Sequence, residues 1–303
     1  MNAKNFLYLA LGAILLVSAC KKDPDPIEPP AEQGPRLIFK FKFDSTQVRL
    51  NNLGQPVTVA PGNEAQCPKM NSMAAHYIEL AQNDFTALGA GEILYRATEN
   101  TVGWSNAVMF DDLNLVAEGE EAFSIPLSDV AAGSYKWIRL SVAYQNYDIK
   151  FKSNSYVGWG TIASFLAFNT LINDYMIKTQ TINVGADKLQ GYWGFEANIP
   201  FFGYYTLTGE APAGATTVVN PNPNSPIPAG SCVITAQFED ANGNPLNLSI
   251  TGNETEDIIV TVSISTNKSF EWIENSGDNL YEPAAGDTLV DMGVRGIIPI
   301  IGN

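Results

Sequence analysis

The sequence predicts an all-β protein: an antiparallel β-sandwich that follows a lipoprotein signal peptide and a proline-rich tether. Short segments of alternating apolar and polar residues recur along most of the 303 residues. Turn-forming residues separate these segments, and the chain has 25 glycines and 18 prolines. Only 16% of the residues are charged, a fraction that favours half-buried strands over long, solvated helices.

The N-terminus has the pattern of a bacterial export signal. Lys4 precedes an apolar stretch, residues 6–17, that is too short to span a bilayer comfortably. The motif VSAC, which ends at Cys20, resembles the lipobox of bacterial lipoproteins. We therefore expect residues 1–19 to be cleaved and Cys20 to be acylated, which would anchor the protein without a transmembrane helix. The alternative is an ordinary signal peptide in which this cysteine occurs by chance.

The tether is expected to occupy residues 20–36, from the lipidated cysteine onward. Residues 21–36 contain five prolines and no apolar periodicity, which indicates an extended chain of polyproline type. The charges at Lys21, Lys22, Asp23 and Asp25 resemble the surface-export signals of some Gram-negative lipoproteins. We expect an outer-membrane lipoprotein whose body, residues 37–303, is one β-sandwich domain in the periplasm or on the cell surface.

The expected strands follow one another along this body. Leu37–Phe43 alternates apolar and basic side chains, so one face meets a core and the other meets water. The other segments with strand-like patterns are residues 76–80, 92–96, 122–127, 134–144, 179–184, 191–197, 232–238, 257–265 and 288–292. Turn residues at 52–54, 132–133, 242–244 and 253 separate several of them.

Two further segments are less regular. Residues 161–178 place apolar side chains at intervals that fit a short helix or two strands broken at Asn169. We expect strands, because the neighbouring segments are strands and Asn169-Thr170 can form a turn. The Pro- and Asn-rich residues 220–228 predict a long loop.

Several short motifs carry a family resemblance. They are FKFKFD at residues 39–44, the strand around His76, residues 126–144, the Tyr-Trp pair within residues 191–196, and residues 257–265. In these motifs the chain resembles the MbnP-like family of exported β-sandwich proteins, and within it a group of uncharacterised envelope lipoproteins. The resemblance implies a β-sandwich and raises copper binding. The copper-binding members are expected to use more than one histidine, whereas this chain has one.

A copper site is one interpretation of residues 67–76. Cys67, Met70, Met73 and His76 recur at every third position, and their sulfur and imidazole groups are donors that copper accepts. They share one face only if the segment winds as a helical turn. In an extended strand the cluster separates, and the alternative makes Met70 and Met73 core residues and His76 an ordinary strand residue.

Cys67 also has a second interpretation. Once Cys20 is acylated, Cys67 and Cys232 are the remaining thiols in an oxidising compartment, and we favour a disulfide between them. That disulfide and a thiolate copper ligand exclude each other.

A calcium site is the corresponding interpretation of residues 274–282. Oxygen donors alternate there, with Glu274, Asp278 and Glu282 as the carboxylates, as in the acidic calcium loops of extracellular modules. Ser276 is a poor ligand, however, and Asn279 stands where a glycine should follow Asp278. An acidic turn that keeps the protein soluble is therefore the favoured alternative.

Other classes of function are disfavoured. The chain has one histidine and no nucleophile-elbow, zinc-protease, phosphate-loop or dinucleotide motif, so we expect no enzyme. A net charge of -15 disfavours nucleic acid as a partner. The tryptophans are expected in the core. If a ligand groove exists, Trp193 beside Tyr192 and Trp137 near Arg139 are the first candidates to line it.

These observations together predict a lipid-anchored envelope lipoprotein that binds an unidentified envelope protein or small ligand, or has a structural role. The alternatives are a copper-binding protein that uses His76 with Met70 and Met73, and a calcium-stabilised surface adhesion module.

Overall fold

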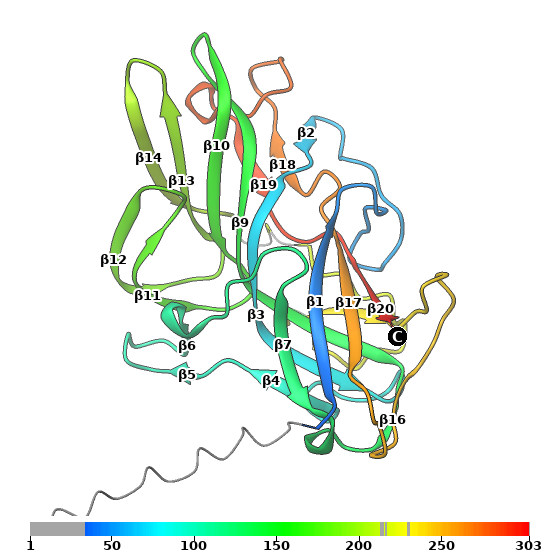
Figure 1. The fold of residues 1–303 in the computed structure, drawn as a ribbon. Coiled ribbons are helices and arrows are strands. Elements are labelled where there is room, and N and C mark those ends of the chain that lie inside the picture. Colours follow the sequence, from blue (N-terminus) through cyan, green and yellow to red (C-terminus); the bar gives the residue numbers. More distant parts are fainter. Residues whose placement is uncertain (1–33, 213–214, 216, 229–230, 303) are drawn as a thin grey trace, which may run out of the picture. The chain divides into compact units, whose positions relative to one another are not determined.

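The computed structural model describes residues 34–302 except 213–214, 216 and 229–230. Gly34–Asn303 forms one compact unit. The signal peptide, Cys20 and nearly all of the expected tether lie outside the described residues, and the first strand begins at Arg36, one residue before the expected body. Figure 1 shows the order of the strands along the chain.

One large sheet, called here the main sheet, runs through the unit. Its strands, in spatial order, are β14 (Gly203–Glu210), β13 (Tyr192–Ile199), β10 (Tyr156–Phe165), β9 (Trp137–Ser153), β3 (Lys69–Ala81) and β4 (Glu92–Arg96), and β15 (Ile234–Gln237) also pairs with β9. All pairings within this sheet are antiparallel.

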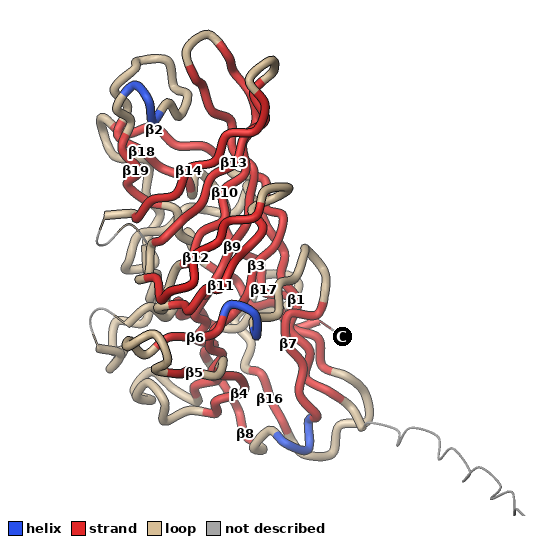
Figure 2. Tube along the Cα trace, turned by 90° about the vertical axis from the view of Figure 1, so that its left-hand side faces the viewer, coloured by secondary structure: helices blue, strands red, loops and turns tan. Residues whose placement is uncertain are grey.

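Within the residues that the structure describes, four smaller sheets accompany the main sheet, and most of their strands are labelled in Figure 2. The β1 sheet is ordered β20 (Ile297–Gly302), β17 (Ile258–Ser265), β1 (Arg36–Asp44) and β7 (Glu121–Pro126). The β11 sheet is ordered β12 (Thr181–Lys188), β11 (Thr170–Met176), β6 (Ala107–Met109) and β5 (Glu99–Asn100). The β18 sheet is ordered β19 (Thr288–Asp291), β18 (Phe270–Ile273) and β2 (Asn63–Gln66), and β16 (Leu248–Ile250) pairs with β8 (Gly133–Tyr135).

In the described part of the chain, the helical elements are three single 3₁₀ turns, at Phe110–Asp112, Leu127–Asp129 and Pro283–Ala285. Among the described residues, no helix has the length and apolar character needed to cross a membrane.

The largest hydrophobic core joins residues of the main sheet and the β1 sheet. Leu37, Phe39 and Phe41 alternate along β1 and are fully buried, whereas Lys40 and Lys42, on the opposite face of the strand, are not. The apolar residues of β3 and β9 complete this core. The alternation in Leu37–Phe43 therefore has the physical meaning that the sequence predicts, one face in the core and one toward water.

A second hydrophobic cluster includes residues of the main sheet and of the β11 sheet. Ala74, Ala143 and Ala163 contribute small side chains from β3, β9 and β10, and Phe165 and Tyr175 are among the larger members. Residues 137–147 of β9 are buried without alternation, because this part of the strand contributes to both clusters.

The predicted all-β, sandwich-like architecture is confirmed, with one refinement, the direction of two strand pairings. Residues 161–178 contain strands, as expected: β10 ends at Phe165 and β11 begins at Thr170. β1 pairs in parallel with β17, and β11 in parallel with β6, whereas we expected only antiparallel pairing. Alternation predicts the buried face of a strand but not the direction of its neighbour.

Candidate functional site

An apolar groove lies between the β13–β14 hairpin and the segment that connects β18 to β19, residues 274–287. It consists of two hollows that share Phe195, Leu207 and Pro283: a smaller one of about 10 Å³, which is room for roughly one water molecule, and a larger one of about 230 Å³. The smaller is lined entirely by apolar and aromatic residues, and Lys152 and Ser153 join the lining of the larger.

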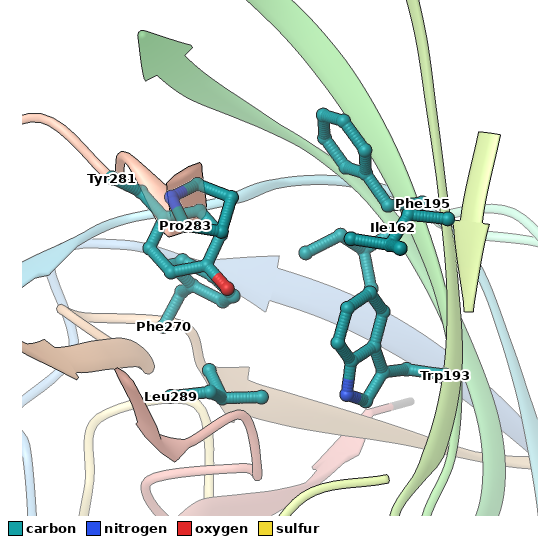
Figure 3. A pocket seen from close by; sticks show the side chains of 8 residues that line it. Ile162, Trp193, Phe195, Phe270, Tyr281, Pro283 and Leu289 are labelled. Carbon is teal, nitrogen blue, oxygen red and sulfur yellow. The ribbon is translucent and has the colours of Figure 1, made fainter. Parts of the chain in front are cut away.

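Two walls face each other across the smaller hollow (Figure 3). Ile162, Trp193 and Phe195 come from the main sheet, and Phe270, Tyr281, Pro283 and Leu289 come from β18, β19 and their connection. Burial raises the pKa of Tyr281 to about 12, an effect to which Asp287 adds, so the hydroxyl is neutral near pH 7. The smaller hollow is thus a narrow apolar seam between the two walls, and the larger hollow is the part of the groove with room for a ligand.

A glycine lets the main-sheet wall form. Gly209 of β14 pairs with Trp193 of β13. A Cβ atom at Gly209 would lie 2.5 Å from the indole ring, so the tryptophan can occupy this position only because its neighbour has no side chain.

The opposite wall is tied to the end of β9. The Lys152 main-chain N–H donates to the Tyr281 carbonyl at 3.0 Å, beside a parallel bridge between Phe151 and Tyr281. Asp287 fixes the connection from within, because its carboxylate accepts bonds from the main-chain N–H groups of Asn275 (2.8 Å) and Glu282 (2.7 Å). This wall is therefore preformed.

β18 is anchored by a buried ionic network beneath the wall. The Glu271 carboxylate binds Arg49 and Arg295, the latter at 2.6 Å, and accepts a bond from the Asn63 amide at 2.7 Å. Burial alone would raise the pKa of Glu271, but the Asn63 hydrogen bond and the two arginines hold it below its ordinary value. Glu271 lies between Phe270, which lines the groove, and Trp272, so the network fixes the position of both rings.

The three carboxylates of the calcium interpretation already have protein partners. The Lys152 ammonium forms ion pairs with Asp278 and, at 3.2 Å, with Glu282. Glu274 is bound elsewhere, because it accepts bonds from the main-chain N–H groups of Ser276 (3.0 Å) and Gly277 (2.7 Å). A protein cation thus takes the place that the interpretation gives to calcium.

The copper interpretation joins side chains that the structure separates. Met73 is fully buried in the largest core, and Met70 packs against the same core. The register of β3 against β9 shifts between Ala75 and Tyr77. His76 lies at this irregularity, where its side chain contacts Ser141, Glu99 and Phe168. Met70, Met73 and His76 therefore do not share a ligand set.

His76 has its own buried surroundings. Its Nδ1 lies 3.4 Å from the Ser141 hydroxyl, its Nε2 lies 3.5 Å from a Glu99 oxygen, and its ring stacks on Phe168 at 4.4 Å. Burial lowers the pKa of His76 below 6.5, more than Glu99 raises it. Among the described residues, no three His, Cys, Asp or Glu side chains gather into a group that could hold a metal ion.

The predicted Cys67–Cys232 disulfide is wrong, since no bond joins the two sulfurs. Cys67 is exposed, and its sulfur accepts a bond from the Lys268 main-chain N–H at 3.3 Å. The Cys232 thiol lies 3.1 Å from the Gln190 side-chain oxygen. The expected disulfide rested on an oxidising compartment and on the number of remaining cysteines. Neither observation shows whether the two thiols are close enough to bond.

Of the aromatic candidates, Trp193 lines the groove, while Tyr192 is buried in the second hydrophobic cluster. Trp137 is buried and donates to Asp84 at 2.9 Å, and Arg139 forms a buried ion pair with Glu79.

Sequence reasoning missed most of the groove, because the strand at residues 203–210 was not among the expected elements. Its signal was present: Tyr205 and Leu207 alternate with Thr206 and Thr208 between Gly203 and Gly209. Tyr281 and Pro283 carried no comparable signal, since they follow an irregular segment whose path depends on tertiary contacts.

Comparison with known proteins gives no relative: no family model, no curated protein and no solved structure matches the chain. The resemblance to the MbnP-like family stays a prediction.

Proposed function

We propose that this protein is an outer-membrane lipoprotein whose lipid-anchored β-sandwich binds an apolar ligand in the groove between β13–β14 and residues 274–287. The observation that supports this proposal most strongly is a preformed hollow with almost exclusively apolar and aromatic walls, in a protein with an acidic sequence. Binding sites for small molecules are concave and mostly apolar, and the larger hollow, at about 230 Å³, approaches their usual size.

The larger hollow suits a small, slender apolar ligand, such as a short acyl chain or a molecule with one or two aromatic ring systems. Each buried methylene contributes about 0.8 kcal/mol, so a chain of six carbons gains roughly 5 kcal/mol before the cost of immobilisation. Lys152 and Ser153, together with the Tyr205 hydroxyl, provide polar groups around the larger hollow, where a ligand's polar end would remain.

The anchor part of the proposal rests on the sequence. The lipobox-like motif at Cys20 supports acylation, and the proline-rich residues after it support an extended tether. Sixteen residues in polyproline conformation, residues 21–36, would reach roughly 50 Å at about 3.1 Å each. The body could then meet a ligand or an envelope partner well beyond the headgroups of its own membrane.

A titration with N-phenyl-1-naphthylamine, a neutral dye that fluoresces in apolar surroundings, tests the groove. Residues 34–303 form the compact unit and contain every lining residue. We expect saturable binding of one dye per chain. The variant Leu207→Trp should bind the dye at least tenfold more weakly, because the indole ring is larger than the leucine side chain and fills the shared part of the groove.

Leu53→Trp is the matched control, because Leu53 is 69% exposed and lies outside the groove lining. It should bind as the parent does. Absence of saturable binding, or equal affinity in the parent and Leu207→Trp, would contradict the proposal.

A further inference from the structure

β14 is an edge strand with an unpaired side. The Ala211 main-chain N–H donates to the Gly191 carbonyl, and the register pairs Tyr192 with Glu210. Hydrogen-bonded pairs alternate with non-hydrogen-bonded ones in an antiparallel ladder, so the odd-numbered residues of β14 bond to β13. The main-chain groups of Tyr204, Thr206 and Thr208 therefore point away from the sheet.

The outer side of β14 is also exposed. Tyr204 and Tyr205 are 53% and 49% exposed, and Thr206 and Thr208 are exposed as well. In the part of the chain that the structure describes, β14 ends the sheet order, and no further strand pairs with it.

The opposite edge of the main sheet and the β7 edge of the β1 sheet carry features that prevent pairing with another chain, whereas β14 does not. β4, at the opposite edge of the main sheet, is five residues long and has an irregular register against β3. β7 ends in Pro126 and is irregular against β1. β14 has eight residues and a continuous register, with no proline and no charge from Gly203 to Gly209. Such an edge is a template for another strand.

We propose that β14 pairs antiparallel with β14 of a second copy of this chain, across a two-fold axis that joins the two main sheets. Both strands must present their outward groups, so even-numbered residues pair with even-numbered residues. The register centred on Leu207 meets this condition. It pairs Thr206 with Thr208 of the second copy and Tyr204 with Glu210 of the second copy, each pair occurring twice.

The side chains are complementary in this register. Thr206–Thr208 pairs are favourable across antiparallel strands, and Glu210 meets a tyrosine rather than the other glutamate. On the groove side, Leu207 meets its own symmetry mate, and Tyr205 faces Gly209, which has no side chain to clash with it. Shifting the register to centre on Thr206 would instead place the exposed Phe202 opposite Glu210.

The chain's net charge of -15 opposes association, but only weakly, because most of these charges lie far from the β14 edge. Charges more than about 8 Å away are screened at physiological ionic strength, and β14 presents no charge before Glu210. Because Tyr205 and Leu207 also line the groove, the grooves of the two copies would open on the same face of the joined sheet. The pairing does not depend on whether the groove holds a ligand.

Cysteine cross-linking of the full chain in intact cells tests this inference. Leu207 and its symmetry mate form a non-hydrogen-bonded pair, with Cα atoms about 4.5 Å apart, within the range for a disulfide. In a Cys67→Ser background, which removes the exposed thiol, Leu207→Cys should give a covalent dimer on a non-reducing gel after mild oxidation. Leu53→Cys, at an exposed site elsewhere, should not.

A proline removes the outward donor and leaves the bonds to β13 intact. Thr206→Pro combined with Leu207→Cys should lower the dimer fraction at least tenfold, whereas Thr206→Ala, which keeps the N–H, should leave it unchanged. A thermal melt of the proline variant like that of its parent shows that the loss is not due to unfolding. Failure of Leu207→Cys to cross-link, cross-linking by Leu53→Cys to the same extent, or an unchanged dimer fraction with Thr206→Pro would overturn the inference.

Discussion

His76 is placed where a charged imidazole is costly. It is buried between Ser141 and Phe168, and the groups that face it carry opposite charges: Glu99, whose carboxylate lies 3.5 Å away, and Arg96, which binds the same Glu99 oxygen at 3.2 Å. Burial is the largest effect on its pKa, followed by the opposing effect of Glu99, and the net direction is downward. The folded protein therefore holds this side chain neutral.

This environment predicts a pH dependence of stability. As the pH falls below about 6.5, His76 in the unfolded chain binds a proton before His76 in the folded protein does, so the free energy of unfolding decreases until the lower, folded pKa is reached. His76 is the chain's one histidine. Urea unfolding at pH 7.5 and 5.5 should show this loss in the parent and a smaller one in His76→Gln. Equal losses in both proteins would contradict the assignment.

Residue types alone could indicate some environments and not others. Trp193 was predictable as a groove residue, because an aromatic pair on a strand is a common ligand surface. The separation of Met73 from His76 follows from the extended conformation, which the sequence analysis recognised as the condition that decides the copper interpretation. The distance between Cys67 and Cys232 depends on the whole chain path, so the predicted disulfide could not be tested by spacing.

The acidic segment between β18 and β19 has its charge partner on a distant strand. Its acidic residues look like a cation loop in sequence, and the cation is supplied by β9 as Lys152. Hydrogen bonds and charge from Asp278 and Glu282 raise the pKa of Lys152 above its ordinary value, so the ammonium is charged throughout the physiological range. Sequence alone could not reveal this partner, which lies 126 residues from Asp278.

A chelator and a substitution should therefore have different effects. EDTA should leave the melting temperature unchanged, because a protein ammonium and main-chain N–H groups satisfy the carboxylates. Lys152→Met should lower it, since Asp278 and Glu282 then repel each other beside the groove, and Lys150→Met, on the exposed part of the same strand, should have little effect. Calorimetric melts test both expectations. A lower melting temperature in EDTA together with no effect of Lys152→Met would support calcium instead.

Most strands could be predicted because one face of each is buried, and alternation reports that face. Strands were harder to predict where apolar and polar residues do not alternate. β9 is buried on both faces, and β14 is exposed along most of its length. The parallel pairing of β1 with β17 joins segments more than 200 residues apart, a contact that no local pattern encodes.

At the scale of the whole molecule, the main sheet has hydrophobic clusters that link it to the β1 sheet and to the β11 sheet. Its β14 end carries both the groove and the unpaired edge. The strands that position this surface, β13 and β10, contribute Phe195 and Ile162 to the largest core. The proposed tether would separate that surface from the lipid anchor.

The central claim is that an acylated envelope protein carries an apolar ligand in its groove, and mass spectrometry of the protein extracted from its own membrane tests this most directly. Under denaturing conditions, the account predicts a chain that begins at an acylated Cys20. Under native conditions, it predicts one additional small apolar molecule per chain, absent from Leu207→Trp and retained by Leu53→Trp. An unmodified Cys20, or a native mass without any bound molecule, would contradict it.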